Sequence, residues 1–321
     1  MDDLLKNLTW VACLVYLDDV IVFAKDFETH IERLDQVLTR FEEANLKLKP
    51  SKWKFAMEEV SYLGFKITKD GLKPDPSKTE TIANLSAPIN KGDVLRFLGM
   101  IGYYRRFISN FGKIAKCLFE VTKAKYKFDW TTEREELFVS LKKDLIEAPI
   151  LIFPDFNNPF ELFCDASATH VGAVLVQRIN GVAHPVAFAS RLLTKQERNY
   201  SASERELLAV VWVTRTFNSY IYGRHIKIYS DHKPLSSLVK AKEPNVRLYR
   251  LMLKLQELDY EILYYQGKLN FTADQLSRPP TETSNVEVKT LEYQANIDWI
   301  KEQENDKEIA IVRSNVRENL K

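Results

Sequence analysis

The apolar positions near the start of the chain fall into two short runs, residues 11–16 and 20–24, which are rich in β-branched and aromatic side chains. Only a Leu-Asp-Asp tripeptide separates the runs, so the pattern predicts a tight β-hairpin. From about residue 27 to 44 the apolar positions recur every three or four residues, which predicts an amphipathic helix. The chain is therefore expected to open with a hairpin followed by a helix.

The middle of the chain has a helical pattern. Pro76 suits the first turn of a helix. The stretches 94–99 and 101–108 predict two helices joined by basic and aromatic residues. A further helix, about 132–147, is expected to end ahead of Pro149, because proline cannot continue a helix.

Strand-like apolar runs return in the second half of the chain, at residues 160–165, 171–176 and 186–190. A helix is expected to start near Ser201, and a further strand follows at 226–231. This order predicts three antiparallel strands ahead of the first helix of the region. The whole pattern indicates a multidomain protein of the α+β or α/β class.

Length and composition allow two or three domains with hydrophobic cores, because the chain has 321 residues and is 45% hydrophobic. The three cysteines are too far apart for a Cys-x-x-Cys motif, and their odd number disfavours a disulfide framework. The N-terminus lacks the pattern of a signal peptide, and no apolar run approaches membrane-spanning length. We therefore expect a soluble protein of a reducing, intracellular compartment.

Charge is unevenly distributed along the chain, although the net charge is only +2. From Pro279 onward nine Asp and Glu residues stand against six Lys and Arg residues, so this segment carries −3 and residues 1–278 carry +5. Residues 281–285 are polar and typical of a linker. The main part of the chain is therefore basic and its tail is acidic.

Carboxylates at the ends of predicted elements are candidates for metal chemistry. Asp18 and Asp19 lie at the tip of the hairpin, although aspartate also favours turns for local hydrogen-bonding reasons. Asp165 and Asp231 each end a predicted strand. Asp274 lies in the first turn of a predicted helix, where an acid also suits the helix dipole. Each residue, taken singly, also has a purely structural interpretation.

Two glutamates, Glu204 and Glu206, begin the helix that follows Ser201. The sequence from Ser201 to Glu204 fits a capping box, in which Glu204 accepts a hydrogen bond from the backbone N–H of the cap residue. Glu206 lies about 200° around the helix from Glu204, so both cannot face one pair of metal ions. We favour Glu206 as the functional glutamate and keep Glu204 as the alternative.

These acids stand in distinctive sequence frames. In the first part of the chain the frames are Tyr16-Leu17-Asp18-Asp19 and Val60-Ser61-Tyr62-Leu63-Gly64-Phe65. In the second half they are Asp-Ala-Ser from Asp165, Glu-Leu-Leu-Ala from Glu206 and Asp-His-Lys-Pro-Leu from Asp231. Over essentially its whole length the chain resembles the Pol polyprotein of gypsy-type (Metaviridae) long-terminal-repeat retrotransposons.

The resemblance implies a partial reverse transcriptase palm with a helical thumb, followed by a ribonuclease H-like fold. That fold is a mixed five-stranded sheet flanked by helices. The implied segments are the C-terminal part of the palm at 1–72, thumb-like helices at 73–115, the connection at 116–155, the ribonuclease H-like domain at 156–279, and a linker and pre-integrase tail at 280–321.

The resemblance also implies the chemistry of the ribonuclease H-like domain. Asp165, Glu206, Asp231 and Asp274 would hold two Mg²⁺ ions, for which Mn²⁺ can substitute. The implied reaction is hydrolysis of RNA paired with DNA, and the expected nucleic acids are an RNA–DNA hybrid and a primer–template.

In the polymerase part, the resemblance assigns Asp18 as a metal-binding catalytic residue with Asp19 as its neighbour. Leu63, Gly64 and Phe65 would hold the primer terminus, although many relatives have His in place of Phe65. Tyr104, Arg105 and Arg106 are candidates for nucleic-acid contact, because arginine pairs with phosphate and aromatic rings stack on bases.

The polymerase centre is expected to be incomplete, because the family's upstream catalytic aspartate has no counterpart in the seventeen residues that precede Asp18. The chain alone is therefore not expected to polymerise DNA. A separate chain that carries the upstream half is one alternative partner, and no membrane is expected. The resemblance places the protein in the cytoplasm, within a virus-like particle, or in the nucleus. The competing interpretation is a non-catalytic nucleic-acid-binding remnant or a domesticated protein.

Overall fold

The computed structural model describes residues 1, 3–231 and 246–264. The chain divides into two compact units, Met1–Thr81 and Ile82–Lys321. Within the described ranges, no helix has both the length and the apolar character needed to cross a membrane.

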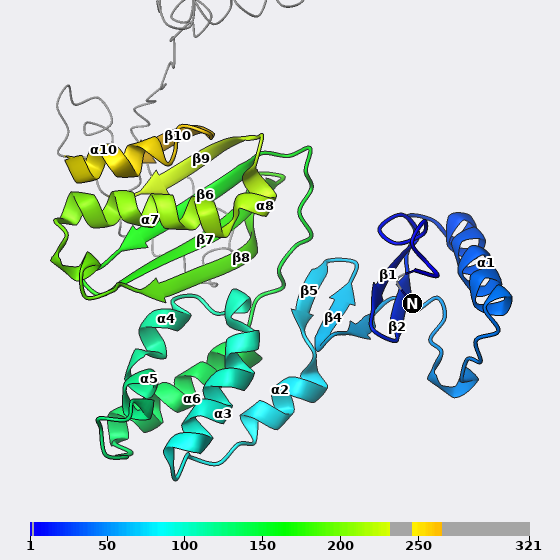
Figure 1. Cartoon of the computed structure of the whole chain (residues 1–321), viewed down its shortest axis with the longest axis horizontal. Helices are drawn as coiled ribbons and strands as arrows, with labels where there is room; N and C mark the ends of the chain where they lie inside the picture. The colour runs from blue at the N-terminus through cyan, green and yellow to red at the C-terminus, as the bar shows by residue number, and fades with distance from the viewer. Residues whose placement is uncertain (2, 232–245, 265–321) are drawn as a thin grey trace, which may run out of the picture. The chain divides into compact units, whose positions relative to one another are not determined.

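A hairpin and a helix share the main core of the first unit (Figure 1). Strands β1 (Cys13–Tyr16) and β2 (Asp19–Val22) pair antiparallel, and α1 (Phe27–Glu43) follows them. Asp26 caps α1 by accepting a hydrogen bond from the backbone N–H of Thr29 at 2.8 Å. The predicted hairpin and amphipathic helix are therefore confirmed. Their buried core residues are Leu5, Cys13, Val37 and Phe41.

The first unit also contains a three-stranded antiparallel sheet, preceded by a short 3-10 helix, η1 (Pro50–Lys52). Its strands are β3 (Val60–Tyr62), β4 (Phe65–Thr68) and β5 (Gly71–Pro74). Leu63 and Gly64 join the first two strands with φ angles of +49° and +74°. A pair of positive φ angles suits a two-residue hairpin, because its twist matches that of the strands.

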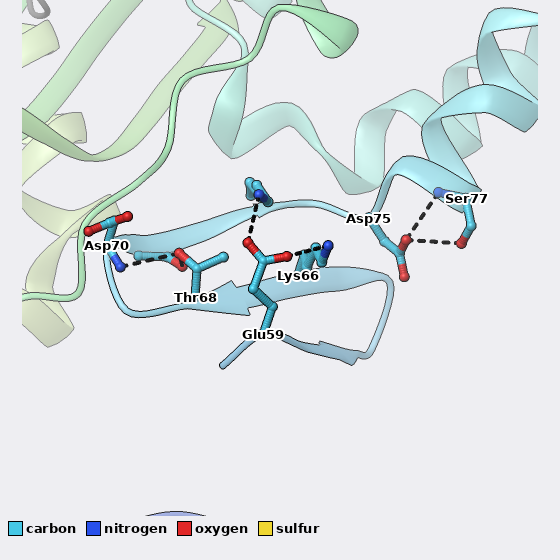
Figure 2. A network of polar contacts seen from close by, with 8 residues as sticks. Glu59, Lys66, Thr68, Asp70, Asp75 and Ser77 are labelled. Atoms are coloured by element: carbon cyan, nitrogen blue, oxygen red, sulfur yellow. Dashed lines mark hydrogen bonds and ion pairs between the residues drawn. The ribbon is translucent and has the colours of Figure 1, made fainter. Parts of the chain in front are cut away.

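Polar contacts connect the strands of this sheet and cap the helix that follows (Figure 2). The Glu59 carboxylate forms ion pairs with one lysine on β4 and one on β5. The Asp75 carboxylate accepts hydrogen bonds from the backbone N–H and the hydroxyl of Ser77, at 3.0 and 2.9 Å. Helix α2 (Pro76–Ala83) therefore begins at Pro76, as predicted, with a side-chain cap.

Helices form the first part of the second unit. They are α3 (Lys91–Tyr103), the 3-10 helix η2 (Arg105–Phe107), α4 (Phe111–Ile114), α5 (Lys116–Thr122) and α6 (Thr132–Ile146). The rings of Phe97 and Phe138 lie 4.5 Å apart and join α3 to α6 in the core. The helix expected at about 132–147 is confirmed. The stretches 94–99 and 101–108, expected as two helices, differ from the prediction, because one continuous helix α3 runs through residue 103 and only the short 3-10 helix η2 follows it.

A five-stranded mixed sheet follows, as the resemblance implied. Its strands are β6 (Phe160–Ala166), β7 (His170–Ile179), β8 (Val182–Leu192), β9 (His225–Ser230) and β10 (Asp259–Tyr264), in the order β10-β9-β6-β7-β8. The pairs β6/β7 and β7/β8 are antiparallel, as predicted, whereas β9 runs parallel to both β6 and β10.

One face of the sheet packs on helices (Figure 1). These helices include α7 (Ala202–Thr216) and α10 (Val246–Leu253), while α8 (Asn218–Ile221) and the 3-10 helix η3 (Glu197–Asn199) are short connections. Leu162 and Cys164 of β6 belong to the core beneath α7. Since side chains alternate along a strand, Phe163 and Asp165 lie on the other side, which we call the Asp165 face.

Candidate metal centre

Asp165 and Asp231 come together because their strands run parallel. β6 pairs with β9, with Phe163 opposite Tyr229, and the two rings stack at 4.4 Å between centroids. Asp165 and Asp231 each lie two residues beyond this stacked pair, so both emerge at the same end of the sheet. One side-chain oxygen each from Asp165, Glu206 and Asp231 lies within 4.8 Å of the others.

Helix α7 supplies the third carboxylate, and its two glutamates lie in different environments. Glu204 forms the predicted capping box with Ser201, and it also accepts a hydrogen bond from Arg247 at 3.0 Å. Glu206 instead accepts a hydrogen bond from the hydroxyl of Ser230 at 3.4 Å, at the end of β9. The capping box is confirmed, and Glu206 is the glutamate that the fold places beside Asp165.

Burial and mutual repulsion dominate the electrostatics of these carboxylates. Burial raises the pKa of Glu206 to about 8, and the carboxylates of Asp165 and Asp231 add to the increase. The backbone N–H of Ala166 and the Ser230 hydroxyl act in the opposite direction. Desolvation also raises the pKa of Asp165, and Asp231 is the second cause. Clustered carboxylates of this kind disfavour ionisation unless a cation joins them.

Neighbouring groups that could take part in chemistry are held in other roles. Burial raises the pKa of the Cys164 thiol well above its usual range, with Glu206 as the next cause, so this side chain remains a neutral core group. The imidazole Nδ1 of buried His170 lies 2.5 Å from the hydroxyl of Ser167. Burial lowers the pKa of His170, so a neutral ring is favoured. The carboxylates are therefore the candidate metal ligands of this site.

The remaining predicted nuclease residue, Asp274, lies outside the described residues, as does the predicted tail at 280–321. Lys113 was not among the predicted site residues, although its charge acts on Asp165 and His170. No local sequence pattern identifies Lys113 as a site residue, because it comes near Asp165 only through packing between segments that are distant in the sequence.

The polymerase-like residues lie at exposed positions of the first unit. Asp18 and Asp19 are exposed at the hairpin, and Leu17 beside them has a φ of +55°. Burial raises the pKa of Tyr62, and the Asp19 carboxylate is the second cause, which indicates that the two hairpins approach one another. Among the described residues, neither aspartate belongs to a group of three side chains that could hold a metal ion.

The predicted nucleic-acid contacts have mixed environments. Leu63, Gly64 and Phe65 are half-buried around the β3–β4 turn. Arg105 is exposed, whereas Tyr104 is only 4% exposed, so stacking of its ring on a base would require a rearrangement. Arg106 donates a hydrogen bond to the Tyr220 hydroxyl at 3.4 Å. A contact role for these residues stays a prediction, and Arg105 is the most accessible of the last three.

Two family models match the chain in separate regions. The model described as reverse transcriptase (RNA-dependent DNA polymerase) matches residues 1–67, and the model described as the RNase H-like domain found in reverse transcriptase matches residues 155–258. The second region contains Asp165, Glu206 and Asp231. Residues 68–154, which include α3 to α6, lie in neither match.

Similar proteins and structures agree with these models. The retrovirus-related Pol polyproteins from transposons 297 and opus of Drosophila melanogaster are 43% and 38% identical, each over 89% of this chain. The chain spans 27% and 30% of their lengths. A structure of the foamy viral protease-reverse transcriptase in complex with RNA/DNA hybrid has a TM-score of 0.68 at 23% identity, and the match covers 91% of this chain and 39% of that one. This likeness concerns the fold.

The relatives, the two family models and the strand order confirm the family predicted from the sequence frames. That family consists of nucleic-acid enzymes, and the ribonuclease H-like domain implies use of a divalent metal ion. The chain belongs to the gypsy-type retrotransposon family of retrovirus-related Pol polyproteins and carries sequence from its reverse transcriptase and its ribonuclease H-like domain.

Proposed function

We propose that the second unit hydrolyses the RNA strand of RNA–DNA hybrids with Mg²⁺ held by Asp165, Glu206 and Asp231. The observation that carries the proposal is the approach of these three carboxylates to within 4.8 Å of one another. They come from two parallel strands and one helix, so the fold has assembled them from distant positions in the sequence. Asp274 is proposed as a fourth ligand from outside the described residues.

The donor set fits a hard divalent cation. Mg²⁺ prefers oxygen ligands, and carboxylates are the protein groups that supply them with charge. Glu206 is buried beside two further acids, an arrangement that is unfavourable without a compensating positive charge. A bound pair of ions would supply an activated water nucleophile and stabilise the departing 3′ oxygen.

The protein's own residues hold the carboxylates in position. The stacked rings of Phe163 and Tyr229 join the two strands just before Asp165 and Asp231. The Ser230 hydroxyl and the backbone N–H of Ala166 fix the Glu206 carboxylate by hydrogen bonds. Orientation by such neighbours is a usual requirement of metal centres, because the ligands must converge without rearrangement.

The substrate class is inferred from the domain and its relatives. The foamy viral protein, which is similar in fold, is described in complex with an RNA/DNA hybrid, and we infer the same class of ligand here. A protein distinguishes the RNA strand by its 2′-hydroxyl groups, which are absent from DNA. We further infer that this chain alone does not extend a primer, since Asp18 and Asp19 share one hairpin and two-metal chemistry needs ligands from several elements.

Cleavage of a labelled RNA strand annealed to DNA tests the proposal. The intact chain should cut the RNA in the presence of Mg²⁺ and not in EDTA. Asp231→Asn should reduce the rate by about a hundredfold or more, because it removes a metal-binding charge. Glu257→Gln, which changes an exposed acid of the same unit, is the matched control and should cut normally.

The result that would reject the nuclease is a chain that binds the hybrid but does not cut it, or cutting that Asp231→Asn leaves unchanged. Either result would favour the competing interpretation, a non-catalytic nucleic-acid-binding remnant. Thermal unfolding of each variant shows whether a loss of cutting reflects a loss of structure.

A further inference from the structure

A row of three small or polar residues crosses the sheet beside the metal centre. Asp165 pairs with Gly172 on β7, and Gly172 pairs with Ser190 on β8. Residues that pair directly across antiparallel strands lie on the same face, so this row belongs to the Asp165 face. The face opposite to α7 therefore has little side-chain bulk beside Asp165.

The short helix α4 contacts β8 and β7, and it lies beside β8 in Figure 1. The backbone N–H of Gly112 donates a hydrogen bond to the Ser190 hydroxyl at 2.7 Å. A Cβ atom on Gly112 would lie 3.1 Å from the backbone of Arg191, and a Cβ atom on Gly172 would lie 2.8 Å from the Asn110 side chain. Both glycines thus permit a close approach, which fixes α4 against the sheet.

This contact brings a positive charge to the acidic site. Lys113 follows Gly112 directly and is exposed. The segment that carries Lys113 lies against Gly172 and Ser190, and Gly172 pairs with Asp165 on the neighbouring strand. Lys116, on α5, also acts on His170. No ion pair of Lys113 occurs among the described residues, so its charge is not committed to a protein carboxylate there.

A lysine beside the carboxylates weakens their affinity for Mg²⁺, because two positive charges repel each other. The charge is favourable once a polyanion occupies the same surface, since lysine neutralises a backbone phosphate and releases counterions. Phosphate contacts of this kind set the register of a nucleic acid on a protein. An exposed lysine on a fixed helix beside the cleavage centre suits that task.

We propose that Lys113 contacts a backbone phosphate of the hybrid and positions the strand for cleavage at the carboxylate centre. The inference rests on the proposed nuclease function and extends it. It assigns part of the substrate-binding surface to α4, which lies outside the region matched by the RNase H-like model. Lys113 is therefore a positioning residue and not a metal ligand.

The test compares Lys113→Gln, Lys113→Arg and the control Lys143→Gln in the full chain. Lys143 is an exposed lysine at the end of α6, with its ammonium group 4.0 Å from Glu147. Binding of a short fluorescein-labelled RNA–DNA hybrid is followed by anisotropy in Ca²⁺, and cleavage kinetics are measured in Mg²⁺.

Lys113→Gln should raise both Kd and KM by about three- to tenfold and leave kcat within about twofold. The slope of log Kd against the logarithm of the salt concentration should decrease by about one, as expected when one phosphate contact is lost. Lys113→Arg should restore binding, because it keeps the charge, and Lys143→Gln should match the unchanged protein.

Unchanged Kd and KM in Lys113→Gln would overturn the proposal, and so would an equal loss in Lys143→Gln. If the unchanged chain binds the hybrid but does not cut it, the proposed nuclease function fails. The positioning role is then still decided by the binding series, so the two failures are distinguishable.

Discussion

At the scale of single residues, Glu204 and Glu206 show how two acids on one helix acquire different tasks. Both side chains are buried, at 4% and 6% exposure. Glu204 is satisfied by the capping box and by Arg247. Glu206 faces two further carboxylates, which are a favourable environment for a cation and an unfavourable one for a lone anion. The two residues should therefore respond oppositely to neutralisation.

We expect Glu206→Gln to stabilise the metal-free protein. The pKa of Glu206 rises from an ordinary value of 4.5 to about 8 on folding, so the folded state holds its proton more tightly. The bound proton adds to the free energy of unfolding. This contribution is fully present below the pKa that Glu206 has in the unfolded state, and it is lost as the pH rises toward 8. At pH 8 in EDTA the variant should be more stable than the unchanged protein by about 1–3 kcal/mol, measured by urea unfolding.

Two conditions serve as controls for that measurement. Below about pH 4.5 the advantage of Glu206→Gln should disappear, because the unchanged glutamate is then protonated in the unfolded state as well as in the folded state. Added Mg²⁺ should stabilise the unchanged protein more than the variant. Glu204→Ala, by contrast, should cost about 1 kcal/mol through the lost cap, with or without Mg²⁺. A destabilised Glu206→Gln at pH 8 in EDTA would contradict the assignment.

At the scale of elements, the contact between α4 and β8 depends on a missing side chain. Gly112→Ala should destabilise the second unit by about 1 kcal/mol, because the new Cβ meets the Arg191 backbone at 3.1 Å. Gly99→Ala is the matched control. A Cβ there meets nothing within 4 Å in the middle of α3, so it should stabilise by about 0.5–1 kcal/mol.

Thermal unfolding of the two variants measures these changes. Because Lys113 follows Gly112, the destabilising variant should also bind the hybrid more weakly, whereas Gly99→Ala should not. Equal stabilisation by both substitutions would show that α4 does not press against β8.

The elements with a long, regular pattern were predictable from the sequence. The amphipathic spacing of α1 and the cap residues of α6 and α7 encode their starts locally, so their positions agree with the prediction to within a few residues. The parallel strand β10 (Asp259–Tyr264) was not predicted, and its pairing could not be, because a local pattern does not identify a partner strand that is distant in the sequence. Only the family resemblance supplied the count of five strands.

The candidate site was predictable only where a local sequence pattern identified its residues. Asp165 and Asp231 were identifiable as strand-end acids in family frames, and the capping box separated Glu204 from Glu206. The position of Lys113 depends on α4, a helix of four residues, which is too short to produce a hydrophobic period. Its approach to Asp165 is a product of packing and so was absent from the sequence prediction.

At the scale of the whole molecule, the matched regions and the compact units divide the chain differently. The reverse transcriptase match ends at residue 67, and the first unit ends at Thr81. The second unit joins the helices α3 to α6 to the ribonuclease H-like sheet, including the contact between α4 and β8. The proposed nuclease surface thus includes helices that precede the matched domain.

A protein of residues 75–321 should therefore fold and cut the hybrid with a kcat within about twofold of the full chain. It keeps Asp75, which caps α2 through Ser77, and all helices of the second unit. A protein of residues 155–321 lacks α4 and should bind the hybrid about three- to tenfold more weakly, as expected for a lost phosphate contact. Circular dichroism, thermal unfolding and cleavage kinetics of the three proteins test this. Equal binding of the hybrid by both shortened proteins would exclude a role for α4. If the protein of residues 75–321 is folded but does not cut the hybrid, the first unit contributes to the nuclease.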